Sequence, residues 1–534
     1  MIKTLIHTLF NTRLRYCTAL ITGTLYALCL PPFNSHHHQL LFLMPLLSLI
    51  VFIPLLYFGT IKNLRRAFVL CFLWGAACGA AQYYWISFDA AEGLWFIIII
   101  GTILAALYVG LYYAAFAMIA GFIFRRFPRM SIIFIPAAFT LIEYSRTLGE
   151  ISFPWTLCGY TLSQFLPMAQ FASIGGIFGI GFLVMVGNVI IYGLIKSASS
   201  RQSFLPRTLL PVGIYLIILV SIAVWGATRM SKAPSYSTSL NTATIALIQS
   251  DINQNKWGEG SLDTCLDISE KMAYQAAQQN PDCMVFAESA IFCYLLRTHN
   301  LKIRVNKWYD STHVPVLFGT LHWDDAPAGS RSAYNVYNAA VVLDSAGFKP
   351  YFKMRLVPFS EALPFEGLFP IVSRLNLGEA DFKKGTVPVV FTIKNKIHAV
   401  PLICYEAIYP GDVRKRVLVD SVANLLVNIT NDGWFGRTSA PYQHAFMTSM
   451  RCIENGISMA RCANSGISLF VNQFGQMSGE TGLYERTITT GTVSLSRMHT
   501  VYTKVGDWPV GLSAIVILIM TGWIIIKRRS KVRE

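Results

Sequence analysis

The sequence predicts a two-part fold: a polytopic α-helical membrane domain of about eight transmembrane helices, and a layered α/β domain outside the membrane. Three observations lead to this prediction. The composition is 54% hydrophobic and 13% charged, which is about half the charged share of an average soluble protein. Long apolar runs fill residues 18–225 and return at 510–526. Residues 240–500 instead alternate short apolar runs with polar helical stretches, as α/β domains do.

The charge distribution also favours a membrane protein. The formal net charge is +16, but residues 233–507 hold 24 Lys+Arg against 23 Asp+Glu. The excess therefore lies in short segments between apolar runs, which is typical of membrane topology. A phosphate-binding surface would gather its cations on one domain, so we expect no nucleic-acid partner.

Eight segments are candidate spans, each judged against the roughly 20 apolar residues that a bilayer requires. The weakest is 130–144, because Glu143 and Arg146 flank its end. No small-residue cleavage site precedes Pro31-Pro32, so the first segment is predicted to be a retained helix and not a signal peptide. The candidates are 14–30, 40–58, 67–87, 94–124, 130–144, 174–195, 209–225 and 510–526.

The basic residues predict the orientation of these spans. Between the spans, the loops 31–39, 88–93 and 146–173 contain a single basic residue, Arg146, whereas the alternate loops and the tail are rich in Lys and Arg. By the positive-inside rule both termini are cytoplasmic. We therefore expect a membrane domain over 1–232, an extracytoplasmic domain over 233–507, and a last span with a basic tail over 508–534.

The extracytoplasmic domain is predicted from alternating short strands and helices. Helices are expected at 261–279 and 444–455. Ser345-Ala346-Gly347 predicts a turn between two strands. The expected strands are 243–249, 284–287, 314–320, 338–344, 348–353, 389–393, 397–403, 423–429 and 467–472.

One cysteine of the eleven lies where a nucleophile would lie. Cys404 follows the apolar, strand-like run 398–403, and Glu406 comes two residues later. The other cysteines are scattered, without a CxxC pair or a Cys/His spacing typical of zinc, so no metal is expected. A cysteine attacks as the thiolate and needs a base or a favourable field.

Two upstream residues could supply that chemistry. Glu288 follows the apolar run 283–287 and could act as the base, and Lys353 could stabilise an oxyanion. Their spacing does not fix any distance, so a plain surface ion pair remains an alternative. A Cys–His pair with His398 or His444 is a second alternative, although His398 lies about 20 Å along the same strand.

The motifs around these residues resemble a known family. Glu288 in Phe-Ala-Glu-Ser, Lys353 in Tyr-Phe-Lys-Met-Arg-Leu-Val-Pro-Phe-Ser-Glu and Cys404 in Cys-Tyr-Glu look like the Glu-Lys-Cys triad of the nitrilase superfamily. The run Asn-Ile-Thr-Asn-Asp-Gly-Trp-Phe-Gly at 428–436 resembles a signature of one branch. With spans on both sides, the whole chain resembles the bacterial apolipoprotein N-acyltransferase family, the membrane-embedded branch of that superfamily.

This resemblance implies a fold, a reaction and partners. The fold of 240–500 would be a nitrilase-like α-β-β-α sandwich, in the inner (cytoplasmic) membrane of a bacterium with the catalytic domain in the periplasm. A phospholipid in the bilayer would donate an acyl chain to Cys404 as a thioester. The acceptor would be the free α-amine of a diacylglyceryl apolipoprotein, in the final step of lipoprotein maturation. Glu288 would be the base and Lys353 would hold the oxyanion, without metal or nucleotide cofactor.

The resemblance also implies supporting residues. Glu361 would orient Lys353, and Tyr405 and Glu406 would shape the turn at the nucleophile. Possible substrate-binding residues are Trp257, Asn338 and Trp434. The chain departs from the family pattern at two positions, with Ala287 in place of proline and Ser360 in place of glycine, which affects loop shape and not the reacting groups.

Three other functions remain open from the sequence. A membrane-tethered amidase of nitrilase type would act on a small amide, but one anchor would suffice for it. A transporter would carry buried ionisable residues in its central spans, which contain almost none. An inactive scaffold would not be expected to retain Glu288, Lys353 and Cys404 together.

Overall fold

The computed structural model describes residues 14–31, 44–88, 95–199, 206–231, 241–252, 261–329, 332–365 and 382–533. The chain divides into two compact units. The first, a helical unit, comprises Met1–Leu148, Phe153–Ser231 and Val505–Glu534. The second comprises Lys232–Lys504 together with Gly149–Ser152, four residues that lie between helices of the first unit in the sequence.

The helical unit contains helices long and apolar enough to cross a membrane. Within the described residues there are five such segments, at Leu64–Phe88, Trp95–Arg126, Ala172–Ala198, Leu209–Ser231 and Trp508–Lys527. The corresponding helices are α5 (Leu64–Tyr83, continued by the 3-10 turn Tyr84–Phe88), α6 (Trp95–Arg126), α10 (Ala172–Ser199), α11 (Pro206–Ser231) and α17 (Trp508–Arg533). They correspond to five of the eight predicted spans, and the chain is therefore a membrane protein.

The other three predicted segments form shorter helices. They are α2 (Arg15–Leu25), α3 (Met44–Leu47) with α4 (Ile53–Gly59), and α7 (Ser131–Ser145). After α2 the chain tightens into the 3-10 turn Tyr26–Cys29 and becomes extended at Leu30, just before Pro31-Pro32, because the residue before a proline disfavours the helical conformation. The count of about eight spans therefore stays a prediction. Two short helices, α8 (Gly159–Ser163) and α9 (Leu166–Ala169), complete the unit.

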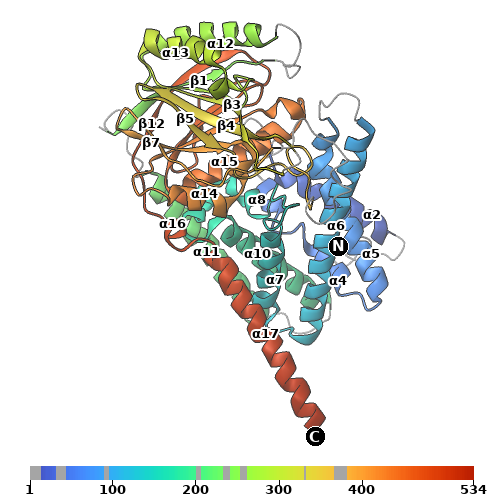
Figure 1. The fold of residues 1–534 in the computed structure, drawn as a ribbon. Coiled ribbons are helices and arrows are strands. Elements are labelled where there is room, and N and C mark those ends of the chain that lie inside the picture. The colour runs from blue at the N-terminus through green and yellow to red at the C-terminus, as the bar shows by residue number, and fades with distance from the viewer. Residues whose placement is uncertain are drawn as a thin grey trace. The chain divides into compact units, whose positions relative to one another are not determined.

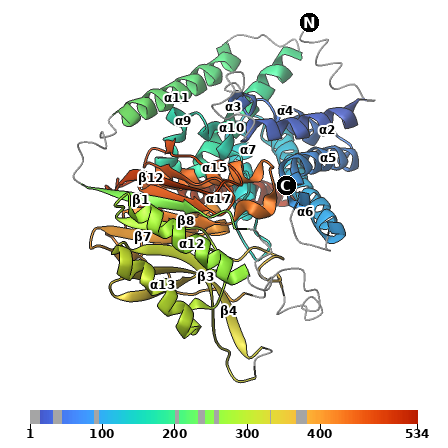
Figure 2. The same ribbon diagram turned by 90° about the horizontal axis from the view of Figure 1, so that it is seen from above.

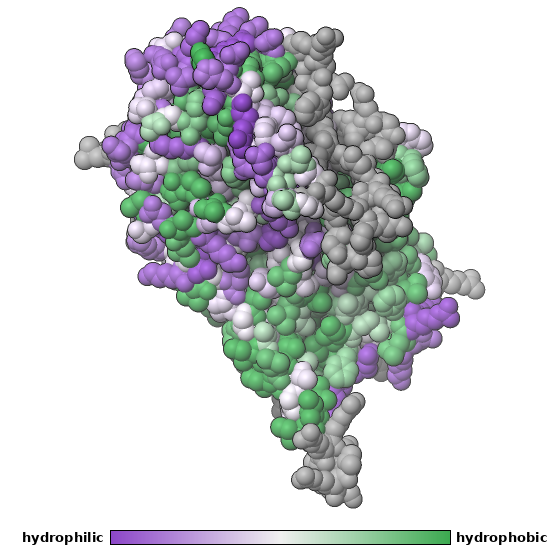
Figure 3. All heavy atoms as spheres, in the orientation of Figure 1, coloured by the Kyte–Doolittle hydropathy of each residue, from purple (hydrophilic) through white to green (hydrophobic). Residues whose placement is uncertain are grey.

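The surface of α17 is that expected of a helix in lipid. Leu512, Ile515, Leu518 and Ile519 are all more than half exposed, and hydrophobic side chains dominate the described part of this helix in Figure 3. Such a set of exposed aliphatic side chains is unfavourable in water and ordinary in a bilayer.

The second unit is a sandwich of two six-stranded sheets (Figure 1). The first sheet has the order β12-β1-β2-β3-β4-β5. Its parallel pairs are β1–β2 and β2–β3, and its other pairs are antiparallel. Its strands are β1 (Thr242–Gln249), β2 (Cys283–Phe286), β3 (Val316–Asp325), β4 (Tyr334–Asp344), β5 (Gly347–Phe352) and β12 (Thr487–Ser494).

The second sheet has the order β11-β10-β9-β8-β7-β6. Its centre, β7–β8–β9, is parallel, and the pairs at its edges are antiparallel. Its strands are β6 (Phe391–Ile393), β7 (Ile397–Ile403), β8 (Leu425–Thr430), β9 (Ser458–Ala463), β10 (Leu469–Val471) and β11 (Met477–Ser478).

Three buried clusters show that the layers are arranged α-β-β-α. The middle cluster lies between the sheets and includes Leu247, Val285, Ile403 and Val427. The outer face of the first sheet packs against α12 (Ser261–Ala277) and α13 (His299–Thr312), which lie outside it in Figure 2. The outer face of the second sheet packs against α14 (Pro410–Val417) and α15 (Ala440–Asn455). The predicted fold class is confirmed for this unit.

Candidate active site

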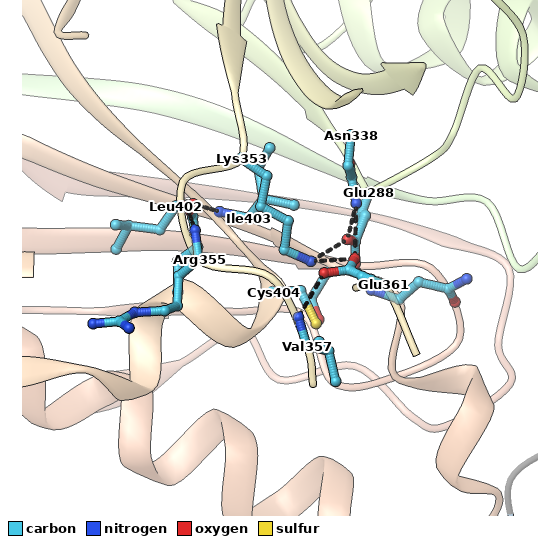
Figure 4. Close-up of polar contacts among 12 residues, drawn as sticks. Glu288, Asn338, Lys353, Arg355, Val357, Glu361, Leu402, Ile403 and Cys404 are labelled. Carbon is cyan, nitrogen blue, oxygen red and sulfur yellow. Dashed lines mark hydrogen bonds and ion pairs between the residues drawn. The ribbon is translucent and has the colours of Figure 1, made fainter. Parts of the chain in front are cut away.

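Cys404 lies at a strained turn directly after β7. It begins the 3-10 turn Cys404–Ile408, and its φ of 49° is in the left-handed region. A non-glycine residue in this conformation costs roughly 1–3 kcal/mol and persists only where its surroundings fix it. The turn breaks the strand direction at the cysteine, and Figure 4 draws Cys404 beside Lys353 and Glu361.

Glu288, Lys353 and Glu361 form one buried cluster beside the Cys404 sulfur (Figure 4). Lys353 Nζ lies 3.1 Å from Glu288 Oε1 and 2.7 Å from Glu361 Oε1. Glu288 follows β2 and Lys353 follows β5 in the first sheet, whereas Cys404 follows β7 in the second. The site therefore lies where strand ends of both sheets meet.

Backbone and amide groups hold the two carboxylates in place. Asn338 Nδ2 donates to Glu288 Oε1 at 2.8 Å and to Glu361 Oε1 at 3.3 Å. The backbone N–H of Asn431 donates to Glu288 Oε2 at 3.0 Å, and that of Val357 to Glu361 Oε2 at 2.9 Å. Glu288 keeps its carboxylate within a fixed frame, which general-base chemistry requires.

The electrostatics of the cluster favour a neutral thiol beside a charged lysine. Burial raises the pKa of the Cys404 thiol, the Glu288 charge raises it further, and Lys353 opposes both. Burial would lower the pKa of Lys353, but the charges of Glu288 and Glu361 outweigh it and hold that pKa above its ordinary value. Cys404 thus rests as the thiol near neutral pH and needs a base in order to attack.

Glu406 joins the segment after Lys353 to the turn at Cys404. Its fully buried carboxylate accepts hydrogen bonds from the backbone N–H groups of Ile403 at 2.8 Å, Met354 at 2.7 Å and Arg355 at 3.2 Å. Arg416 Nη2 lies 2.7 Å from Oε1, and the Tyr351 hydroxyl donates to the same oxygen at 2.7 Å. Burial would raise the pKa of Glu406, but Arg416 and these donors lower it, so the carboxylate is charged.

A second buried ion cluster adjoins the backbone of Cys404. His444 Nε2 is 3.3 Å from the carbonyl oxygen of Cys404, and its Nδ1 is 2.9 Å from Asp432 Oδ1. Arg461 Nη2 donates to Asp432 Oδ2 at 2.6 Å. Burial, with Arg461 nearby, lowers the pKa of His444, so the imidazole is neutral at pH 7. His398, by contrast, bonds to Thr392 and Asn424 at the far end of β7.

The same cluster brings three metal-ligating side chains together. One ligand atom each from Cys404, Asp432 and His444 lies within 4.8 Å of the others. However, both oxygens of Asp432 are already bonded, one by Arg461 and the other by Thr430 and His444. The guanidinium supplies the positive charge that a cation would otherwise supply, so these residues fit an ion-pair network better than a metal site.

Tyr405 reaches the short segment 149–152. Its hydroxyl donates to the carbonyl oxygen of Ser152 at 2.6 Å, and the Tyr409 hydroxyl donates to the same oxygen at 2.9 Å. Arg355 stacks over the Tyr409 ring at 4.4 Å and pairs with Asp412. These contacts tie the turn that begins at Cys404 to a segment that is remote in the sequence.

Three residues were predicted to bind substrate. Asn338 bonds to Glu288 and Glu361 in the buried cluster. Trp434 is half-buried in the 3-10 turn Asp432–Phe435, and its substrate-binding role stays a prediction. Trp257 lies outside the described residues.

Sequence reasoning missed several of the site's buried partners. These are Tyr351, Arg416, Tyr409, Asp432, Arg461 and Ser152. Tyr351 and Asp432 lie within the motifs around Lys353 and at 428–436, and these motifs were the available signal for them.

Comparison with known proteins identifies the family. Residues 22–190 match the apolipoprotein N-acyltransferase N-terminal domain, and residues 244–502 match the carbon-nitrogen hydrolase domain. An apolipoprotein N-acyltransferase from Geobacter metallireducens is 31% identical over 503 residues, covering 92% of each chain. Another, from Chlorobaculum tepidum, is 30% identical and covers 71% of this chain and 74% of its own.

A solved carbon-nitrogen hydrolase from Helicobacter pylori G27 covers 48% of this chain and 90% of its own, with 14% identity and a TM-score of 0.37. The 31% identity over 92% of each chain in the Geobacter metallireducens relative, together with both domain matches, decides the assignment. The chain belongs to the apolipoprotein N-acyltransferase family.

Proposed function

We propose that the protein transfers a fatty acyl chain from a membrane phospholipid to the free N-terminal α-amine of the diacylglyceryl-cysteine of an apolipoprotein. The observation that supports this most is Cys404 at a strained strand end, with its sulfur beside the Lys353–Glu288 pair. The names of the relatives agree with this activity. The apolar spans would keep both lipid substrates in the same bilayer as the enzyme.

In the first half-reaction, Glu288 takes the thiol proton while the Cys404 sulfur attacks the ester carbonyl of the phospholipid. The carbonyl oxygen becomes an oxyanion beside the Lys353 ammonium, which stabilises the new charge. When the intermediate collapses, the C–O bond breaks and Glu288 returns the proton to the departing alkoxide. The lysophospholipid leaves, and the acyl chain stays on Cys404 as a thioester.

In the second half-reaction, the α-amine of the apolipoprotein attacks the thioester. Glu288 accepts a proton from the amine, and the C–S bond breaks to release the amide product. The same proton restores the thiol. Glu361 holds Lys353 against this site, while Glu406 keeps the lysine segment and the Cys404 turn in register. Tyr405 contributes by fixing the turn from its other side.

We infer the orientation of the spans from the basic residues in the loops. Lys and Arg gather in alternate loops and in the C-terminal tail, and the positive-inside rule assigns these loops and both termini to the cytoplasm. Domain bounds of 1–232, 233–507 and 508–534 then put the catalytic domain in the periplasm of a bacterial inner membrane. The two family matches, at 22–190 and 244–502, fall on either side of the first boundary.

The proposal is tested with purified full-length protein in mixed micelles. A phospholipid with a labelled acyl chain is supplied with a peptide whose N-terminal cysteine carries a diacylglyceryl group and a free α-amine. We expect label on the peptide amine, no transfer to the same peptide with an acetylated amine, and no transfer by Cys404→Ala. Hydrolysis of a small amide without transfer to the peptide would instead favour the tethered amidase.

A further inference from the structure

An exposed aliphatic patch on the second unit consists of residues that take no part in the candidate active site. We call it the α14–α16 patch, and it consists of Leu418, Val419 and Val422 with Val501 of α16 (Val501–Val505). Each of these four side chains is 46–49% exposed. Scattered exposed aliphatics need no explanation, but a group at one place marks an interaction surface.

Hydrogen bonds join the two halves of the patch. Arg414 Nε donates to the carbonyl oxygens of Tyr502 and Thr503, and Arg414 Nη2 to that of Lys504, at 2.9–3.1 Å. Leu418 follows Arg414 by four residues and bonds back to its carbonyl oxygen, so the two residues share a helix face. Arg497 Nη1 donates to the Ser421 carbonyl oxygen at 2.9 Å, which holds the 418–422 loop on the same side.

The patch is held close to a point where the chain enters a span. Trp508, the first residue of the segment Trp508–Lys527, is only four positions after Lys504. Four residues extend at most about 14 Å. The polar headgroup layers add roughly 5–7 Å on each side of the hydrocarbon core. A surface attached by so short a segment is therefore within reach of the headgroup layer.

The charges around the patch are suited to anionic lipid. Lys415 and Lys504 are exposed, and Arg414 and Arg497 are half-buried beside them. Facing acidic groups are few: Asp420 lies within the loop and accepts from Val422 N–H, and Asp412 is paired with Arg355. Aliphatic side chains flanked by Lys and Arg are the combination that binds a membrane interface.

We propose that the α14–α16 patch is a membrane-docking surface of the second unit, which inserts Leu418, Val419 and Val422 among the headgroups of anionic lipid. Docking there fixes the height of the α/β domain over the bilayer independently of substrate binding. The partner is the lipid surface, and a protein covering the same patch is the competing outcome.

The test uses an environment-sensitive fluorophore on the full chain in nanodiscs. Cys17, Cys293 and Cys404, the cysteines that are not buried, are replaced by serine. A single cysteine is then introduced as Val419→Cys or, as the matched control, Ile303→Cys on α13. Ile303 is 48% exposed, like Val419, but belongs to the outer helix layer. Quenching by shallow nitroxide lipids and by aqueous iodide is measured with increasing phosphatidylglycerol.

We expect lipid quenching at position 419 several-fold stronger than at 303, protection of 419 from iodide, and an increase with phosphatidylglycerol that Lys415→Glu removes. Equal iodide access at 419 and 303 would overturn the proposal. Protection of 419 from both quenchers would also overturn it, because it would show that protein and not lipid covers the patch. Neither result depends on acyl transfer, so failure here is separable from failure of the proposed function.

Discussion

Substitution Glu406→Gln perturbs the residue that joins the two halves of the site. The Glu406 carboxylate is fully buried and pairs with Arg416, whose side chain is 6% exposed. Glutamine keeps the volume but removes the charge. If its oxygen takes the Oε1 position, its NH2 group faces the Ile403 N–H, which now bonds to Oε2 at 2.8 Å. Two donors then oppose each other.

The magnitude follows from these contacts. Removing one partner of a buried ion pair costs about 3–5 kcal/mol, because the other charge stays buried without compensation. For a unit of this size, 1 kcal/mol lowers the midpoint of thermal unfolding by about 2–4 °C. We therefore expect a decrease of roughly 10 °C.

The assay is thermal unfolding in detergent, monitored by intrinsic fluorescence, together with acyl transfer measured at 20 °C below each midpoint. The control is Asp263→Asn, which removes an exposed ion pair with Arg304 and should cost less than about 1 kcal/mol. Glu406→Gln should also lower kcat, because Met354 and Ile403, which adjoin Lys353 and Cys404 in the chain, lose their common anchor. A midpoint within 2 °C of wild type, a margin of about 1 kcal/mol, would refute the reasoning.

Three further predictions follow from the site. Lys353→Met should lower the rate of thioester formation by about 10²–10³-fold, the usual effect of losing an oxyanion donor. Single-turnover kinetics with labelled phospholipid measure this rate, and an unchanged rate would show that Lys353 does not stabilise the oxyanion. Tyr409→Phe leaves Ser152 with the Tyr405 bond alone and should destabilise the unit by about 1–3 kcal/mol, which unfolding in detergent checks against Tyr442→Phe, an exposed tyrosine. Burial would raise the pKa of Asp432, but Arg461 and His444 lower it to about 2. The charged Asp432 therefore stabilises the folded state fully above its unfolded pKa near 3.9, and this stabilisation is lost as the pH falls to 2. The difference in unfolding midpoint between wild type and Asp432→Asn should shrink between these two pH values, and a difference that stays constant would contradict the prediction.

The sequence predicted correctly those strands whose apolar runs match their place in the fold. An apolar run ending in a reactive residue marks a strand end, and this predicted the positions of Glu288, Lys353 and Cys404. Their convergence was not deducible from spacing, since β2 and β5 lie in one sheet and β7 in the other. The resemblance supplied that step, and the hydrogen bonds around Lys353 are consistent with it.

Other elements were missed for identifiable reasons. Strand β9 (Ser458–Ala463) is fully buried yet contains Arg461, and a charge in such a run hides the strand pattern. Strand β12 (Thr487–Ser494) is polar because it lies at a sheet edge. Helix α14 is only eight residues long and basic. Its sequence therefore has no apolar periodicity that would predict a helix, or predict that Arg416 is buried.

The central claim is that Cys404 carries the acyl chain as a thioester. Full-length protein is incubated with a dipalmitoyl phospholipid without acceptor, quenched in acid and analysed by peptide mass spectrometry. The account predicts one palmitoyl group on Cys404, released by hydroxylamine and by addition of a diacylglyceryl-cysteine peptide, and absent in Cys404→Ala. Transfer to the peptide by Cys404→Ala, or an acyl group on another cysteine with Cys404 unmodified, would contradict it.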